Sequence, residues 1–392
     1  MATLLIFIAV LAVLVLSHEF GHFIVARLSG MKVEEFGFGF PPRLCGIRRL
    51  LNGRRQIIWG NRQVLAAEKT SGEQGGTIYS FNWLPLGGFV KIKGEDGKSD
   101  SEPDSFASKK FWHKAAVLVA GVAMNVLVGA VLISLGFMIG LPQPLEGIDD
   151  VKNISDRRIE ILQALPGKPA EAAGLKTGDT IIKIGSLEQP RLSELRAYVD
   201  AHRDEAILVT WQRGNEKMSQ NIRPIVYPDT GKGGLGVSVV EIGTVRYPFF
   251  KALENGIITT GFYLKHITLA FGQLIKSLFT GAALGGTVSG PVGVAVMTGQ
   301  VARMGLVYLL QFMAILSLNL AVLNILPIPA LDGGRLLFII LAKIFRRPQG
   351  FRYEHVAHAV GFALLILLVV AVTVKDVSMF KGVLLTWWGR IF

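Results

Sequence analysis

Long apolar runs divide this chain into segments of two kinds. A helix needs about 20 apolar residues to cross the hydrocarbon core of a bilayer. Four runs meet that length, at residues 1–28, 117–139, 305–325 and 357–374. The pattern therefore predicts a polytopic α-helical membrane protein with about four spans.

A fifth apolar run, residues 257–279, differs from these four. It carries Lys265, His266 and Lys276 within its length. Charges at these positions are typical of an amphipathic helix that lies in the membrane interface. We predict such a helix here, and an inserted helix remains the alternative.

The stretch from residue 142 to about residue 228 has the pattern of a water-soluble domain. Its charges are balanced, and it contains short β-rich runs such as residues 206–211. Residues 166–184 predict a turn, a short helix, a turn and a strand, and a helix is predicted at 192–202. This string resembles a PDZ domain of the bacterial protease type, a module that adds an extended peptide to a sheet edge. A generic small α+β domain is the alternative.

Residues 36–93 are rich in glycine and aromatic side chains. Alternating runs such as residues 56–59 predict β-hairpins. Apolar backbone without helix is tolerated at a membrane only where its polar groups are paired or line a cavity. We expect a membrane-associated β-hairpin region whose strand edge takes up a substrate strand, with an ordinary cytoplasmic β-subdomain as the alternative.

Composition agrees with a membrane protein. The 392 residues are 51% hydrophobic, and the mean hydropathy is +0.45, which is too apolar for an ordinary soluble enzyme. A single cysteine, Cys45, excludes an intramolecular disulfide and a cysteine-based zinc site. The net charge is +12, but no basic stripe with interleaved aromatics supports nucleic-acid binding.

The basic residues instead predict topology. Residues 27–114 hold fifteen Lys and Arg against nine Asp and Glu, and the link between the last two spans is also basic. Basic loops remain on the cytoplasmic side, so we expect both termini and residues 141–250 outside. The start of the chain lacks the basic region of a signal peptide and is expected to remain as a span.

The first span contains the string Ser17-His18-Glu19-Phe20-Gly21-His22. Two histidines four residues apart lie on one helix face, so both can bind one zinc ion. Glu19 lies beside them, where a carboxylate can accept a proton from the attacking water. Ionisable groups are costly in a membrane span, so we predict Zn2+ ligation by His18 and His22, rather than a chance match or buried histidines that bond to the backbone.

Catalytic zinc needs a third protein ligand. The best candidate is Asp332, which follows the third span in the string Asn324-Ile-Leu-Pro-Ile-Pro-Ala-Leu-Asp332-Gly-Gly-Arg. The two prolines break the helix and can turn Asp332 toward the membrane core, and the glycines permit close backbone approach. It falls on the same membrane side as His22. An aspartate that merely caps the next helix is the alternative.

Together these motifs resemble the site-2 protease family, most closely the RseP-type regulated intramembrane zinc metalloproteases of bacteria. The resemblance covers nearly the whole chain and includes the motif elements Gly87-Gly88-Phe89-Val90, Ala120-Gly-Val-Ala-Met-Asn125 and Ser289-Gly-Pro-Val-Gly293. It implies an endopeptidase of the bacterial inner membrane that cuts single-pass membrane proteins within or near their spans after a first cut. Anti-sigma factors and signal-peptide remnants are example substrates. Two features depart from the family pattern. There is room for about one PDZ domain where many members have two, and Val122 stands where the family usually has proline.

The resemblance and the chemistry assign roles. Zinc lowers the pKa of a bound water toward about 7, and Glu19 takes the proton and later delivers it to the leaving amide. Candidate substrate-binding residues are Asn324, Asn125, Gly87, Gly88 and Phe89. A helix-packing hydrogen bond is the alternative role for the two asparagines.

Other functions remain as alternatives. A proteolytically silent membrane scaffold that binds envelope peptides through its PDZ domain ranks second, although a structural zinc site would need no Glu19. A metal transporter ranks last, because no second acidic relay appears in the spans. His355 and His358, three residues apart, could form a second metal pair, but we expect them to extend to the interface.

The predicted organisation has seven parts. They are residues 1–35, the first span with its metal motif; 36–110, the cytoplasmic or membrane re-entrant β region; 111–141, the second span; 142–230, the extracytoplasmic PDZ domain; 231–303, a linker with the interfacial helix; 304–335, the third span with the aspartate motif; and 336–392, the cytoplasmic link, fourth span and tail.

Overall fold

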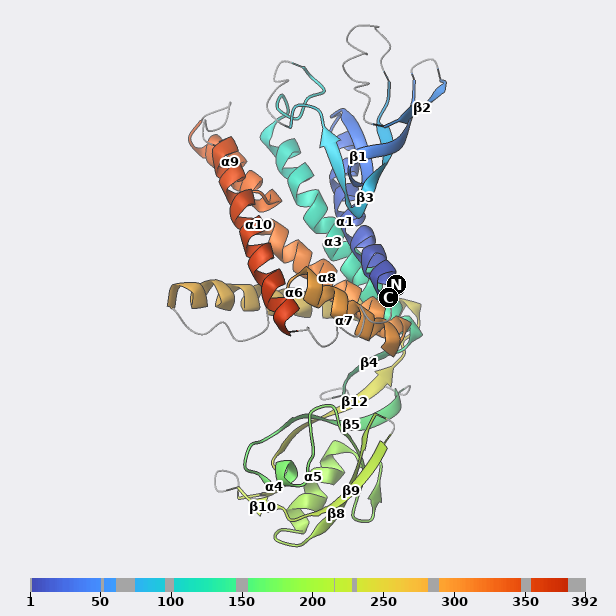
Figure 1. The fold of residues 1–392 in the computed structure, drawn as a ribbon, viewed down its shortest axis with the longest axis vertical. Helices are drawn as coiled ribbons and strands as arrows, with labels where there is room; N and C mark the ends of the chain where they lie inside the picture. The colour runs from blue at the N-terminus through green and yellow to red at the C-terminus, as the bar shows by residue number, and fades with distance from the viewer. Residues whose placement is uncertain are drawn as a thin grey trace. The chain divides into compact units, whose positions relative to one another are not determined.

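A computed structural model describes residues 2–50, 53–60, 75–95, 102–145, 154–214, 216–227, 231–280, 289–346 and 354–379. The chain folds into two compact units (Figure 1). We call Met1–Leu135 with Leu253–Phe392 the helical unit, and Gly136–Ala252 the sheet unit. The tail beyond residue 379 and the basic link at residues 347–353 lie outside the described residues.

Four helices are long and apolar enough to cross a membrane among the described residues. They are α1 (Ala2–Leu28), α3 (Phe111–Ile139), α8 (Leu306–Ile325) and α10 (Glu354–Met379). The four predicted spans are confirmed by length and composition. Each helix contains or closely matches the apolar run that predicted it.

Three further helices of more than ten residues lie in the described part of the chain. They are α6 (Phe249–Thr280), α7 (Pro291–Met304) and α9 (Asp332–Ile344). Helix α6 begins eight residues before the predicted interfacial helix and is not among the four candidate spans. Its place in the interface stays a prediction.

The spans approach one another closely at glycines. A Cβ on Gly21 of α1 would lie 2.4 Å from the Ala120 carbonyl oxygen of α3. Between α8 and α3, the Ser317 hydroxyl donates to the Asn125 carbonyl at 2.8 Å. Small residues and interhelical hydrogen bonds are how helices associate in lipid. These contacts join α1, α3 and α8 around the candidate site.

A three-stranded sheet follows α1, as the predicted β-hairpins require. Its strands are β1 (Val33–Arg49), β2 (Arg55–Trp59) and β3 (Ile78–Ile92), in the order β2-β1-β3. The last part of β3 pairs with the first part of β1, with Val90 opposite Phe36. Gly88 of β3 contacts α1 so closely that a Cβ would lie 2.8 Å from the Leu16 side chain. β3 therefore runs directly beside the metal motif of α1.

The sheet unit contains a seven-stranded antiparallel sheet with the order β4-β12-β5-β6-β8-β9, in which β7 pairs with β6. Its strands are β4 (Leu141–Pro144), β5 (Ile154–Ala164), β6 (Thr180–Ile184), β7 (Leu187–Glu188), β8 (Ile207–Arg213), β9 (Glu216–Ile222) and β12 (Val237–Val245). The remaining elements are helices α4 (Pro169–Ala172) and α5 (Leu192–Ala201) and the hairpin of β10 (Ile225–Val226) and β11 (Gly233–Gly234).

The sheet unit is longer than the predicted domain of residues 142–230. Strand β12 lies in the stretch expected to be linker, yet it pairs with β5 along most of its length and with β4 near its end. An apolar core lies between the sheet and helix α5. Ile161, Trp211 and Leu195 are buried together in it, so α5 packs its apolar face on the sheet.

Candidate metal centre and active site

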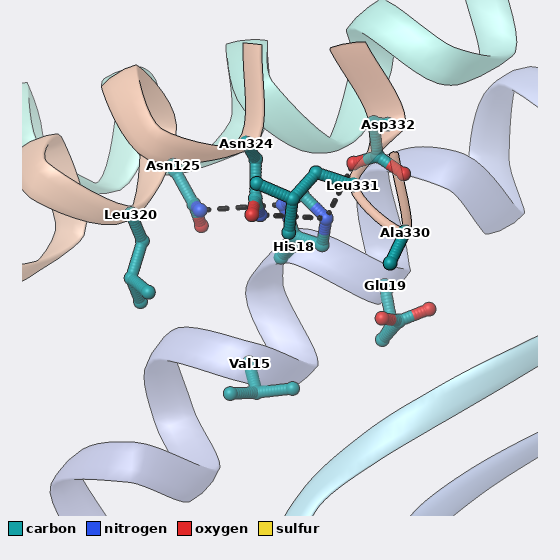
Figure 2. Close-up of a pocket in the computed structure, with 9 residues that line it drawn as sticks. All are labelled: Val15, His18, Glu19, Asn125, Leu320, Asn324, Ala330, Leu331 and Asp332. Carbon is teal, nitrogen blue, oxygen red and sulfur yellow. Dashed lines mark hydrogen bonds and ion pairs between the residues drawn. The ribbon is translucent and has the colours of Figure 1, made fainter. Parts of the chain in front are cut away.

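Three predicted ligands meet at one point in the helical unit. His18 Nε2 and His22 Nε2 lie 3.0 and 3.4 Å from the same Asp332 carboxylate oxygen, Oδ2. The two imidazole nitrogens are 3.1 Å apart. All three donor atoms lie within 4.8 Å of one another, and they form the one group of this kind among the described residues. Figure 2 shows His18, Glu19 and Asp332 among the residues that line one cavity.

The donor set fits zinc. Two imidazoles and a carboxylate are ordinary zinc ligands, and a three-ligand set leaves a position open for water. Asp332 Oδ2 is buried and has no hydrogen-bond partner, although both imidazoles point at it. A buried carboxylate oxygen without a donor needs a positive partner, which a cation between the three side chains would supply.

The local fold of α1 and α3 makes room for this centre. Histidines four residues apart lie one above the other on α1. They face Gly121 of α3, where a Cβ would lie 2.3 Å from His22 Nε2 and 2.7 Å from His18 Cε1. Only glycine at this position leaves space for both rings.

Each imidazole is oriented from its other nitrogen. His22 Nδ1 donates to the Val117 carbonyl at 2.7 Å, which leaves the Nε2 lone pair free for a metal. His18 Nδ1 lies 3.2 Å from Nδ2 of Asn125, while Asn125 Oδ1 is buried without a partner. A half-turn of that amide places Oδ1 where it accepts the Nδ1 proton of His18. His18 is then oriented in the same way as His22.

The break between α8 and α9 places Asp332. Helix α8 ends at Ile325, before the two prolines, and α9 begins at Asp332. A Cβ on Gly333 would lie 2.2 Å from the Ile325 carbonyl oxygen, and a Cβ on Gly334 would lie 2.2 Å from that of Ile328. The predicted close approach of backbone at these glycines is therefore present, and it folds α9 back against the end of α8.

Glu19 shares a cavity of about 250 Å3 with two of the three ligands, His18 and Asp332. Its Oε2 accepts a hydrogen bond from the backbone N–H of Val90 at 3.1 Å. The cavity is lined by Val15, His18, Glu19, Asn125, Leu320, Asn324, Ala330, Leu331 and Asp332 (Figure 2). The carboxylate is thus held by β3 at a place where a water or a peptide can reach it.

The predicted substrate-binding residues divide into two groups. Asn125 and Asn324 both line the cavity, and Asn324 Nδ2 lies 3.3 Å from His18 Nε2. Gly87, Gly88 and Phe89 do not line it. Phe89 instead packs over Gly37, where a Cβ would lie 2.4 Å from the phenylalanine ring. The site therefore brings together the two asparagines, and the role of the β3 residues stays a prediction.

Three features of the site were not predicted. These are the Val90 amide on Glu19, the space that Gly121 leaves for the imidazoles, and a hydrogen bond from the Ala330 N–H to His358 Nδ1 at 2.8 Å. Gly121 belongs to a motif that the sequence analysis singled out, so a signal existed. His358 was expected to extend to the interface. It instead accepts a hydrogen bond from the Ala330 N–H in the loop before Asp332, and so pairs that backbone donor.

Known proteins resemble this chain along nearly all its length. The model of "Peptidase family M50" matches residues 6–55 and 64–368. A Clostridium perfringens protein named as a zinc metalloprotease is 32% identical, and the match covers 93% of this chain and 95% of that protein. The zinc metalloprotease RasP of Geobacillus kaustophilus is 27% identical over 95% of this chain and 97% of that protein.

Solved structures match a smaller part. One match is to the PDZ domain of an SdrC-like protein from Listeria monocytogenes. It covers 23% of this chain and 92% of that domain, with 18% identity and a TM-score of 0.20. At that TM-score we base no conclusion on the likeness.

Proposed function

The chain belongs to peptidase family M50, the site-2 proteases, and is a zinc metalloendopeptidase of the membrane; on that premise we propose that it cleaves single-pass membrane proteins within or near their spans. The proposal includes regulated intramembrane proteolysis, in which another protease first removes the outer part of the substrate. Anti-sigma factors and signal-peptide remnants are substrates of this kind. The observation that carries the proposal is the convergence of His18, His22 and Asp332 beside Glu19.

His18, His22 and Asp332 would hold the zinc ion. When bound, zinc supplies Lewis-acid polarisation and makes water a better nucleophile at neutral pH. Val117 and Asn125 hold the two imidazoles in the orientation that directs Nε2 toward the centre. The protein's part is therefore to fix the ligands before substrate arrives.

Glu19 is proposed as the general base and acid. It accepts a proton from the attacking water and returns it to the nitrogen of the leaving amide. The Val90 N–H holds one carboxylate oxygen, Oε2, at 3.1 Å, so the other oxygen is available for the proton. Asn324 and Asn125 are candidates to donate to the substrate carbonyl oxygen as negative charge develops there.

A substrate helix hides its amides in internal hydrogen bonds, so cleavage requires local unwinding. The edge of β3 can hold an unwound segment as an added strand. The N–H of Val90 is already bonded to Glu19, so strand addition would use the neighbouring residues Gly87, Gly88 and Phe89. An added strand at that place would pass beside the general base.

Charge and exposed apolar surface support the proposed placement in the membrane. The basic segments of the helical unit support an active site near the cytoplasmic face of a bacterial inner membrane. The β1–β3 sheet exposes Trp59, Tyr79, Phe81 and Trp83, as a membrane-associated sheet would.

We propose that the sheet unit is an extracytoplasmic PDZ domain that binds peptide or protein ends. Its support is the helix α5 packed on an antiparallel sheet and the PDZ-like string at residues 166–184.

Replacement of Glu19 by glutamine tests the proposal. The variant should keep zinc and fold in detergent but cut a helical membrane substrate at least about 100-fold more slowly, the ordinary contribution of a general base. Undiminished cleavage would remove the proposed base. A comparison of membrane proteomes from cells with wild type and Glu19→Gln should reveal accumulated single-span fragments, which identify the substrates.

The ligand set has its own test. Asp332→Ala should lose zinc, measured by metal analysis of the purified protein, because two imidazoles alone hold zinc weakly. Unchanged metal content would contradict the assignment of Asp332. Asp332→Asn is a matched variant of equal size that removes the charge.

A further inference from the structure

The loop that carries Asp332 into the site has a backbone conformation that must be held from outside. Ala330 has φ = +79°, in the region that favours glycine. For a residue with a side chain such a conformation is unfavourable and persists only where neighbours enforce it. Asp332 lies two residues further along, so any relaxation of Ala330 would move the ligand.

Helix α10 supplies the contacts that hold this loop. The Ala330 N–H donates to Nδ1 of His358 on α10 at 2.8 Å. Three residues along, Gly361 lies against Pro329, where a Cβ would be 2.6 Å from both the proline Cβ and its carbonyl oxygen. The loop is therefore fixed by one hydrogen bond and one close contact from the same helix.

A third contact fixes the orientation of His358. Its ring packs against Phe338 of α9, with the ring centroids 5.4 Å apart. The imidazole thus touches the loop before Asp332 and the helix after it. Helix α10 contributes no metal ligand, yet it contacts the chain on both sides of one.

We propose that His358 is a positioning residue for the zinc centre, which fixes Asp332 through the backbone of Ala330. The inference rests on the ligand set proposed above. It gives helix α10 an indirect role in metal binding, because the helix supplies no ligand but holds the loop that carries one. Partners of this kind typically change metal affinity by about 10–100-fold.

The test compares zinc affinity, measured by competition with a chelator, in four variants. His358→Leu removes the acceptor and keeps an apolar side chain, and it should weaken zinc binding about 10-fold or more. His358→Asn places an amide oxygen near the position of Nδ1 and should bind zinc within a few-fold of wild type. His355→Leu alters an exposed histidine of the same helix and should have no effect. Gly361→Ala should displace Pro329 and weaken zinc as His358→Leu does.

Several outcomes decide the matter. Unchanged zinc affinity in His358→Leu would overturn the proposal, and so would equal losses in His358→Leu and His358→Asn, since packing alone would then account for them. Thermal unfolding of the helical unit identifies a variant that has not folded, and Gly361→Ala provides the second route in that case. If Asp332→Ala loses zinc while His358→Leu retains it, only this inference fails. If Asp332→Ala retains zinc, the ligand set itself fails.

Discussion

The two units of this protein distribute their apolar side chains in opposite ways. The sheet unit buries Ile161, Val209 and Ile184 completely, as a domain in water must. The most apolar stretch of α10 in the helical unit has none of its residues buried, and those of the other three spans are 28–39% buried. Fully buried side chains there include the polar Asn125 and Ser317.

This difference shows that different forces hold the two units together. Burial of apolar surface stabilises the sheet unit by about 25 cal/mol per Å2. Helices in lipid gain little from that effect, since lipid tails are as apolar as leucine, and they associate through close packing and polar contacts. Asn125 contacts both α1 and α8, and Gly121 leaves room for the two imidazoles against α3, so helix packing and chemistry coincide at these two residues of the helical unit.

Substitution of Gly121 by alanine should have the largest effect, because it acts on packing and ligands together. The new Cβ would lie 2.3 Å from His22 Nε2 and must displace a ligand. We expect zinc affinity to fall by about 100-fold and cleavage to be lost with it. Metal analysis and a cleavage assay measure this. Gly136→Ala, on the same helix, meets only the Leu141 side chain, at 3.3 Å, and is the control. Full zinc content in Gly121→Ala would show that the rings have more room than the structure gives them.

The next prediction compares equal losses of side-chain volume in the two units. Ile161→Ala creates a cavity in the sheet unit and should cost about 2–5 kcal/mol. Leu367→Ala on α10, where the leucine is 65% exposed, should cost less than about 1 kcal/mol, since the side chain faces lipid. Hydrogen exchange of the intact protein, read separately for each unit, measures both. Similar costs at the two positions would contradict the proposed contrast.

A smaller effect concerns acid stability of the sheet unit. Burial raises the pKa of the Asp179 carboxyl. Hydrogen bonds from the Arg213 guanidinium at 2.7 Å and from the Lys176 amide lower this pKa by more than burial raises it, so it lies below its usual value. A carboxyl of this kind contributes stability above the unfolded-state pKa of about 3.9, and the contribution is lost as pH falls through the lower folded-state pKa.

Asp179→Asn should therefore lower the stability of the sheet unit at neutral pH by about 1.5–3 kcal/mol, the range for a hydrogen bond to a charged group. It should also remove part of the loss that wild type shows below about pH 4. Urea unfolding at several pH values measures this. Glu188→Gln, at an exposed ion pair with Lys183, is the control and should behave as wild type. A parallel pH profile in Asp179→Asn would contradict the assigned role.

Much of the architecture was predictable because it depends on local pattern. Four spans followed from apolar length, and strands β6 and β8 of the sheet unit followed from the turn-bounded string at residues 166–184 and the β-rich run at 206–211. The C-terminal boundary of the sheet unit, beyond the predicted residue 230, was not predictable. Strand β12 joins the sheet through backbone hydrogen bonds to β5, and no side-chain pattern in residues 237–245 distinguishes that pairing from a linker strand.

The candidate site was predictable where residue type alone limits the chemistry. His18, His22 and Asp332 are the residues that zinc would select, and membrane spans rarely contain such groups without a function. His358 could not be assigned in this way, since its partner is a backbone N–H, which every residue type except proline supplies at position 330. Likewise, the structural need for Gly121 depends on which helix face meets the imidazoles.

The order of the ligands along the chain has a consequence for biosynthesis. His18 and His22 leave the ribosome early, whereas Asp332 follows the whole sheet unit, and α10 follows later still. A nascent chain that has inserted only its first spans carries the proposed base and two imidazoles but lacks the proposed third ligand. With that ligand set, the metal centre can form only after Asp332 has been synthesised.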